Sequence, residues 1–316
     1  MHIFSNAIGV FVFDEEIELV DKILFSGLDD YKNKEKFIAG ITGKYKNQKE
    51  LDRDTLKKVL LYFKNNKFFN DFYSKNVEIT KSDVKDSVRD DILIIHAINS
   101  VEEIDKSVNI LVKRLREWYE LYNPEFSMAV ESHERFVEEI LEKEKKDLLK
   151  ELKIEPSYSI GADLKQEDIE PIKSLAHQIY DLFQLKKSLM NYISTLMDEL
   201  CPNIKAVCGV ITGAMLIDKT GSLKRLSELP ASTVQVLGAE NALFRHMKTG
   251  AKPPRHGVII HHPLLANAPN KVHGKIARVL ADKIAIASKV DYFKGQFIGD
   301  KLRKILDDKF GQQNDR

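Results

Sequence analysis

The sequence lacks most of the features that identify common enzymes. Neither G-x-S-x-G nor H-E-x-x-H occurs, and G-x-x-x-x-G-K-[ST] and G-x-G-x-x-G are also missing. These absences exclude the usual serine-hydrolase, zinc-protease and phosphate-loop motifs. They also argue against binding of a dinucleotide or adenosyl cofactor by this chain. We therefore expect no catalytic residue, no metal site and no cofactor on it.

Cysteine and long apolar runs are scarce as well. The longest uncharged apolar run, AVCGVITGAMLI at 206–217, is shorter than the roughly 18–20 residues of a membrane-spanning helix. The first residues have neither the basic segment nor the cleavage site of a signal peptide. Cys201 and Cys208 would lie about 10.5 Å apart on one helix, too far for a disulfide. We expect a soluble cytoplasmic protein that binds no membrane and buries two reduced cysteines.

Charge is abundant but unevenly distributed. Charged residues make up 31% of the chain, whose formal net charge is only +1. Residues 244–304 nevertheless contain 13 Lys or Arg against three Asp, a net charge of +10, so the remainder carries −9. This distribution predicts one end that binds a polyanion and an acidic remainder.

The sequence pattern predicts a mostly α-helical fold in three regions. Residues 1–95 form a small α+β domain with a buried strand at HIFSNAIGVFVFD, in which valines and phenylalanines alternate, and a weaker strand NVEIT at 76–80. Residues 96–202 form a helical linker and a coiled coil. Residues 203–316 form an α-helical domain, in which GKIARVLADKIAIASKVDYF has an apolar face and glycines end the helices.

The strongest periodic signal lies in the second half of the coiled-coil region. Apolar residues recur there at alternating three- and four-residue steps, interrupted only by Lys186, as is typical of a coiled coil. The short break KIEPSYSIGADL predicts an antiparallel hairpin between the helix before it, at 133–152, and the helix after it. A polar seam residue often sets the oligomeric state, so we predict dimerisation, with a purely intramolecular hairpin as the alternative. The predicted seam is Ile172, Leu175, Ile179, Leu182, Lys186, Leu189, Ile193 and Leu196.

The stretch GAENALFRHMKTGAKPPRHGVIIHHP, at 238–263, admits three interpretations. His256, His261 and His262 suggest a metal hydrolase by number, but no carboxylate lies nearby, and adjacent histidines on an extended segment point to opposite faces. A serine hydrolase lacks its motif, because the nearby serines are explained as helix caps. RNA binding fits better: Lys and Arg attract phosphate, His and Arg planes stack on bases, and prolines make the loop rigid.

Several blocks of the sequence resemble those of a known protein family. LPASTVQVLGAENALFRHMKTGAKPPRHGVIIHHP and GKIARVLADKIAIASKVDYF resemble the Nop domain, and RLREWYELYNPEF and MDELCPNIKAVCG resemble the segments that flank the family's coiled coil. The whole chain is similar to the archaeal Nop-family core protein of box C/D ribonucleoproteins, without the Lys-rich tail of nucleolar relatives.

The resemblance implies a non-catalytic scaffold for RNA-guided 2′-O-ribose methylation of rRNA or tRNA. The implied partners are a fibrillarin-type methyltransferase that carries S-adenosylmethionine, a kink-turn-binding protein similar to ribosomal proteins, a box C/D guide RNA and a second copy of the chain. The acidic N-terminal half would hold the methyltransferase. A splicing-type Nop protein, which binds a kink-turn but not fibrillarin, is the alternative within the family, and the strand-rich start favours the methylation complex.

Residue by residue, the matched blocks and their side-chain chemistry suggest a set of RNA contacts. Asn241 stands where the family usually has a lysine, and NAPNKVH replaces the usual basic or aromatic run before GKIAR. Contacts at these two places are therefore the ones most altered. The predicted RNA-binding residues are Gln235, Asn241, Arg245, His246, Lys252, Arg255, His256, His261, Lys271, Lys275 and Arg278.

Overall fold

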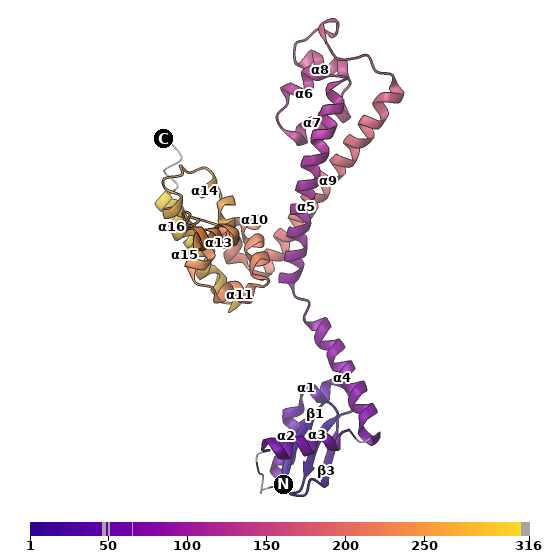
Figure 1. Cartoon of the computed structure of the whole chain (residues 1–316), viewed down its shortest axis with the longest axis vertical. Coiled ribbons are helices and arrows are strands. Elements are labelled where there is room, and N and C mark those ends of the chain that lie inside the picture. The colour runs from indigo at the N-terminus through magenta and orange to yellow at the C-terminus, as the bar shows by residue number, and fades with distance from the viewer. Residues whose placement is uncertain (46–48, 50, 65, 311–316) are drawn as a thin grey trace. The chain divides into compact units, whose positions relative to one another are not determined.

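The computed structural model describes residues 1–45, 49, 51–64 and 66–310 (Figure 1). The chain divides into two compact units, 1–89 and 90–316, of which the last six residues are not described. The division falls before 95, the predicted end of the first domain, because Ile94 is already buried in the core of the second unit. The second unit contains both remaining predicted regions and has two separate apolar clusters.

The first unit contains a three-stranded antiparallel sheet with helices on both faces. The single strand predicted at the N-terminus is two strands, because the chain reverses at Ala7–Ile8, where the Ile8 N–H donates to Asn6 Oδ1 at 3.0 Å. The alternation itself is confirmed: Val10 and Val12 pack on one face, Phe11 and Phe13 on the other. The elements are β1 His2–Asn6, β2 Gly9–Phe13, β3 Leu19–Leu24, α1 Leu28–Lys32, α2 Lys34–Lys44, α3 Arg53–Tyr62 and α4 Asn66–Asp86.

The strand predicted at 76–80 is wrong, since these residues lie within α4. Phe68 and Ile79 are buried and Phe72 is half-buried, at the spacing of one helical face. The β-branched residues of NVEIT favoured a strand only locally, and the longer helical period decides the structure.

The second unit begins with a long antiparallel helical hairpin, residues 90–200. Here the prediction of the hairpin's first helix is wrong, because the main partner of α9 (Gln166–Leu200) is α5 (Asp90–Glu120), and of segment 133–152 only α7 (His133–Glu142) also packs against α9. Segment 133–152 is itself broken into two helices at Lys143 and Glu144, which are extended. Its apolar residues instead close the far end of the hairpin. The elements are α5 Asp90–Glu120, α6 Pro124–Ala129, α7 His133–Glu142, α8 Lys145–Glu151, the 3-10 turn η1 Pro156–Tyr158 and α9 Gln166–Leu200.

The predicted dimerisation seam lies inside this hairpin. Ile172, Ile179, Ile193 and Leu196 are buried, and Leu175, Leu182 and Leu189 are partly buried within the two clusters. Lys186, the polar residue that interrupts the apolar seam, forms an ion pair: its Nζ lies 2.5 Å from the carboxylate of Asp105 on α5. The buried members of the predicted seam are thus occupied by contacts within one copy of the chain.

The C-terminal helices pack around α15. Its predicted apolar face is confirmed, since Ile276, Leu280, Ile284 and Ala287 are all buried. Cys201 and Cys208 are buried free thiols, as predicted. The elements are α10 Pro202–Thr220, α11 Leu223–Glu228, α12 Ala231–Val236, α13 Glu240–Thr249, the 3-10 turn η2 Val258–His261, α14 Pro263–Ala266, α15 His273–Tyr292 and α16 Gly299–Phe310.

The negative charge of the chain is concentrated in the hairpin. Residues 90–200 contain 24 Asp or Glu and 14 Lys or Arg, whereas residues 1–89 contain 15 and 16. The first unit is therefore almost neutral. Among the residues that the structure describes, no helix combines the length and the apolar character that crossing a membrane requires.

Candidate nucleic-acid interface

The predicted RNA-binding residues occupy three neighbouring parts of the C-terminal chain. Asn241, Arg245 and His246 are on α13, Lys275 and Arg278 are on α15, and the others lie on or beside the connecting loops. Most are exposed, whereas Gln235, His246 and His256 are half-buried. Within the described ranges, none of the lysines or arginines in the predicted set forms an ion pair, so their charge is available to a polyanion.

Backbone contacts fix the loop from 250 to 257 against the end of α12. The loop begins at Gly250, whose φ of 70° ends α13 in the left-handed conformation that glycine favours. Gln235 Nε2 donates to the carbonyl of Arg255 at 2.7 Å, and the N–H of Gly257 donates to the carbonyl of Gln235 at 2.9 Å. Gln235 is thus a residue that holds the loop in place. This loop, with its two prolines, is ordered before any ligand binds.

A second loop, residues 267–272, is tied to the first. Arg255 Nη1 donates to the carbonyl of Asn270 at 2.8 Å. His273 Nδ1 lies 3.4 Å from His256 Nε2, and His273 Nε2 lies 2.8 Å from the carbonyl of Ala268. Arg255 and His256 on one loop and Lys271 on the other therefore belong to one connected surface. Arg255 uses one of its five N–H donors here, which leaves the rest for phosphate or base contacts.

The histidines differ in what they can do. Burial, then the charges of His273 and Arg255, lower the pKa of His256, so this ring is a neutral hydrogen-bonding group rather than a cation. His246 Nδ1 is hydrogen-bonded to the carbonyl of Ala251, and this contact connects α13 to the start of the loop. Both rings act on loop geometry, a role that their residue type alone did not predict.

His261 and His262 differ in burial, although His261 ends the 3-10 turn η2 instead of lying on an extended segment. His261 is exposed, whereas His262 is buried with Nε2 3.2 Å from the carbonyl of Val207. Burial lowers the pKa of His262. In the part of the chain that the structure describes, no group of three His, Cys, Asp or Glu could hold a metal ion. The geometry thus gives the metal-hydrolase interpretation no support.

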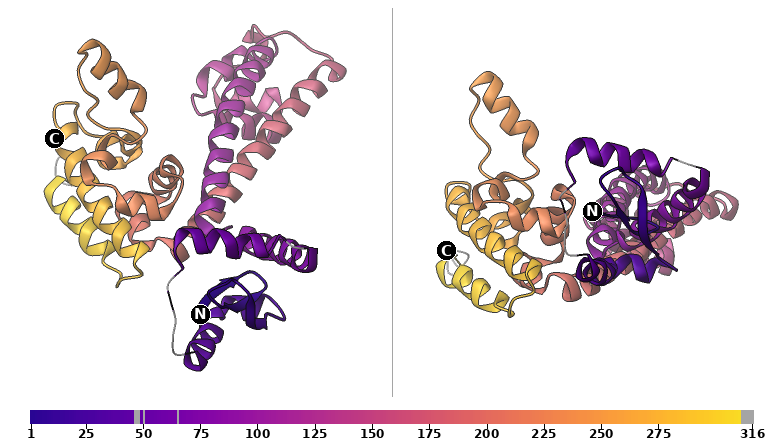
Figure 2. Two further views of the ribbon diagram at one scale, coloured as in Figure 1. Left: turned by 60° about the horizontal axis from the view of Figure 1, so that its bottom comes forward. Right: turned by 90° about the horizontal axis from the view of Figure 1, so that it is seen from below.

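Helix α13 projects as an arm from the rest of the C-terminal helices (Figure 2). None of its residues is buried, and Phe244 and Met247 are 57% and 75% exposed. Lys248 Nζ lies 4.5 Å from the centre of the Phe244 ring. Phe244 and Met247 were not among the predicted contacts, because apolar positions on a helix normally indicate a core face. Only the absence of packing around the arm identifies them as an exposed surface.

Comparisons with known proteins give a consistent result. The family model Nop, described as snoRNA binding domain, fibrillarin, matches residues 100–312. A NOP5 family protein of Methanocaldococcus jannaschii is 41% identical over 265 residues, which is 79% of this chain and 64% of that protein. Nucleolar protein 58 of Candida albicans is 37% identical over 238 residues, 71% of this chain and 45% of that protein.

Nucleolar protein 56 of Schizosaccharomyces pombe is 36% identical over 224 residues, or 65% of this chain and 45% of that protein. The chain therefore spans less than two thirds of the length of these relatives. A chain in a solved fibrillarin/Nop5p complex is 22% identical with a TM-score of 0.45, over 98% of this chain and 99% of that one.

Proposed function

The chain belongs to the Nop family, and from this premise we propose that it is a non-catalytic scaffold of a box C/D ribonucleoprotein. Its C-terminal helices bind a kink-turn in the guide RNA together with a small kink-turn-binding protein. Its first unit binds a fibrillarin-type methyltransferase, which carries S-adenosylmethionine and performs the chemistry. The scaffold acts by positioning enzyme and guided substrate, which turns their encounter into an effectively intramolecular reaction.

One observation carries the RNA-binding part of the proposal. Arg255, His256 and Lys271 lie on two loops that are fastened to each other and to α12, while their lysine and arginine charges have no acidic partner in the described chain. A fixed surface loses little conformational entropy on binding. Lys275 and Arg278 extend the positive charge along the exposed side of α15.

The arm supports recognition of RNA and protein together. Phe244 and Met247 offer an apolar surface, whereas Arg245 and Lys248 on the same helix offer charge. Aromatic residues and Met are enriched at protein interfaces, and Arg and Lys attract phosphate. The arm therefore suits a complex in which the kink-turn protein and its RNA present one joint surface.

The first unit has its own candidate for the methyltransferase surface. On α4, Phe69 and Tyr73 are exposed and their rings stack with centroids 6.5 Å apart. Since this unit is almost neutral, docking there depends on apolar contact rather than on attraction to an acidic surface. The excess negative charge of the N-terminal half of the chain lies in the hairpin, residues 90–200, and not in the first unit.

The deciding experiment is a gel-shift titration with a kink-turn RNA at two salt concentrations, with and without the small kink-turn protein. Binding that requires this protein supports joint recognition. Equal, strongly salt-dependent binding to any RNA would reduce the basic segment to a non-specific surface. A pull-down with fibrillarin separates the methylation scaffold from the splicing-type alternative, which does not retain fibrillarin.

A further inference from the structure

The loop that joins α15 to α16, residues 293–297, is fixed at both ends. Asn203, which is buried at the start of α10, accepts the N–H of Ile298 on its Oδ1 at 2.7 Å and donates from its Nδ2 to the carboxylate of Asp291 at 2.7 Å. The N–H of Gly295 donates to a carbonyl in the last turn of α15 at 2.8 Å. The loop therefore has a defined conformation before any partner binds.

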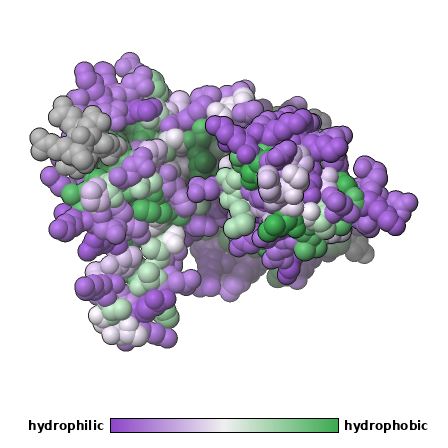
Figure 3. All heavy atoms as spheres, turned by 90° about the horizontal axis from the view of Figure 1, so that it is seen from above, coloured by the Kyte–Doolittle hydropathy of each residue, from purple (hydrophilic) through white to green (hydrophobic). Residues whose placement is uncertain are grey.

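Two aromatic side chains of this loop are exposed to solvent. Phe293 is 76% exposed and Phe297 is 51% exposed. The Phe293 ring meets the half-buried Tyr292 ring at an edge, with centroids 5.1 Å apart and planes inclined by 73°. Scattered exposed apolar residues are ordinary, and one face of the molecule shows them among hydrophilic residues (Figure 3). Two large rings on one fixed loop instead form a preorganised aromatic surface.

Free positive charge flanks the two rings. Lys294 follows Phe293 directly, and Lys289 precedes that ring by four residues, about one helical turn. Lys301 follows Phe297 by four residues. All three lysines are exposed, and none forms an ion pair within the part of the chain that the structure describes. Rings and available cations therefore alternate along this end of the C-terminal helices.

Acidic groups cancel little of this charge. Residues 289–304 contain five Lys or Arg and two Asp, a net charge of +3. Asp291 is buried, and its carboxylate is occupied by three N–H donors at the start of α10, so that only Asp300 is exposed. Arg303 lies 3.7 Å from the carboxylate of Asp307, which leaves the lysines as the free cations. A surface with this balance of charge attracts a polyanion.

This surface is separate from the proposed kink-turn surface. Arg278, the last predicted contact on α15, and Phe293 are fifteen residues apart, which corresponds to about 22 Å along a helix. Between them, Lys283 pairs with Asp282 at 3.0 Å and offers no free charge. The C-terminal helices thus present two positive surfaces at the two ends of α15.

We propose that this loop is a second RNA site, which holds a single-stranded stretch by stacking its bases on Phe293 and Phe297. Lys289, Lys294 and Lys301 contact the phosphates beside these bases. Because every base has an aromatic face, such a site accepts any sequence. The inference goes beyond the proposed function, since it requires neither a kink-turn nor the kink-turn protein.

An acidic protein segment is the competing occupant, and the composition of the surface disfavours it. Lysine is depleted at the centres of protein interfaces, whereas here lysines flank both rings. The exposed aliphatic residue that follows on α16, Ile305, lies eight residues beyond Phe297, so the loop offers aromatic rings rather than a broad apolar patch. Rings interleaved with cations are typical of single-strand binding.

The test is binding of a fluorescently labelled oligouridine, which forms no stable fold, to the full chain, read by fluorescence anisotropy. The variant F293A/F297A should bind at least about tenfold more weakly, whereas F293Y/F297Y, which keeps both rings, should retain the affinity. The control Y158A removes an exposed ring from the hairpin and should bind like the unaltered chain. K294A should reduce the slope of log K against log salt by about 0.7, the value for one phosphate of a single strand.

The kink-turn titration on the same variants separates this site from the proposed function. F293A/F297A should assemble with the kink-turn complex as well as the unaltered chain does, which also shows that the variant is folded. Loss of both activities would mean that the rings support the fold, and the inference would be overturned.

Three other results would contradict the second site. The unaltered chain could fail to bind oligouridine, F293A/F297A could bind it with unchanged affinity, or F293Y/F297Y could lose as much affinity as the alanine variant. Each of these leaves the kink-turn proposal to its own titration. Binding of a labelled oligoglutamate that depends on both rings, without binding of oligouridine, would assign the loop to an acidic protein instead.

Discussion

His273 Nδ1 lies 3.4 Å from His256 Nε2, with the ring planes inclined by 58°, so two loops of the basic surface share a contact that depends on protonation. The contact is a hydrogen bond only while at least one ring is neutral, because two imidazolium rings have donors alone. The positive charge of Arg255 lies close to the pair and helps to lower the pKa of His256. His256, whose lowered pKa favours the neutral ring, therefore keeps this contact between the loops.

This relationship predicts acid sensitivity. The pKa of His256 is lowered in the folded chain, first by burial. In the unfolded chain this histidine has its ordinary pKa of about 6.5, so below that pH the unfolded chain binds a proton more readily than the folded chain. The contribution of His256 to the free energy of unfolding is therefore fully present above about pH 6.5, and it is lost as the pH falls from there through the lowered pKa of the folded chain. Urea unfolding at pH 7.5 and 5.5 should give a lower free energy of unfolding at pH 5.5. His256→Gln should reduce the difference, and an unchanged difference would remove His256 from the cause.

Salt dependence tests the basic side of α15. If Lys275 and Arg278 each neutralise one phosphate, replacing either by Ala should reduce the slope of log K against log salt by about one. Lys283→Ala is the control on the same helix, since Lys283 is half-buried and pairs with Asp282 at 3.0 Å. Titration with the kink-turn complex at several salt concentrations measures the slopes. Equal slopes for all three variants would exclude α15 from the interface.

The parts of the fold that follow from local chemistry were predictable. Ser222 caps α11 by accepting the Arg225 N–H at 3.2 Å, and Gly221 ends α10 with a φ of 77°. Asp52 likewise caps α3 by accepting the Thr55 N–H. These features depend on residues a few positions apart, so a single sequence determines them.

Partner choice was not predictable in the same way. Segment 133–152 and α5 are both helical and amphipathic, and nothing local decides how they share α9. Val108, Val112 and Leu115 of α5 lie in one buried cluster with residues of α7 and α9, an arrangement of distant segments that local sequence patterns do not determine. The exposed residues Phe244 and Phe293 were missed because exposure is a property of the folded chain.

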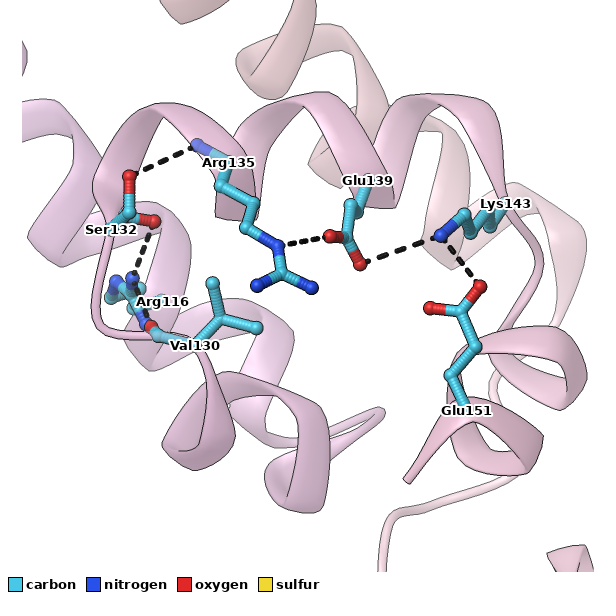
Figure 4. Close-up of polar contacts among 7 residues, drawn as sticks. All are labelled: Arg116, Val130, Ser132, Arg135, Glu139, Lys143 and Glu151. Atoms are coloured by element: carbon cyan, nitrogen blue, oxygen red, sulfur yellow. Dashed lines mark hydrogen bonds and ion pairs between the residues drawn. The ribbon is translucent and has the colours of Figure 1, made fainter. Parts of the chain in front are cut away.

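Arg116 offers a stability test at the hairpin end (Figure 4). Its Nη1 donates to the carbonyl of Ser127 and its Nη2 to that of Val130, both at 2.7 Å, and its guanidinium lies 4.2 Å from the centre of the Phe136 ring. Arg116→Ala leaves these carbonyls without their charged donor and should reduce the free energy of unfolding by roughly 2–3 kcal/mol.

The control for Arg116 lies one half-turn away. Arg114 pairs only with exposed Glu117 at 2.6 Å, so Arg114→Ala should cost less than about 1 kcal/mol. Chemical denaturation of both variants measures the difference. Equal losses would mean that the carbonyl contacts of Arg116 contribute little beyond an ordinary surface pair.

Gly257 connects the packing of the basic loops to their proposed role. A Cβ at this residue would lie 1.8 Å from the carbonyl oxygen of Leu237 and 2.6 Å from its carbon, both backbone atoms that cannot move independently. Gly257→Ala must therefore displace the loop that carries Arg255 and His256, and we expect weaker assembly with the kink-turn complex at unchanged helix content.

Gly274→Ala is the control, because a Cβ there meets nothing within 4 Å. Since Gly274 lies in the first turn of α15, the alanine should change stability by no more than about 1 kcal/mol. Circular dichroism and the gel-shift titration separate the two effects. If Gly257→Ala assembles as well as Gly274→Ala, the position of this loop is not what the RNA complex recognises.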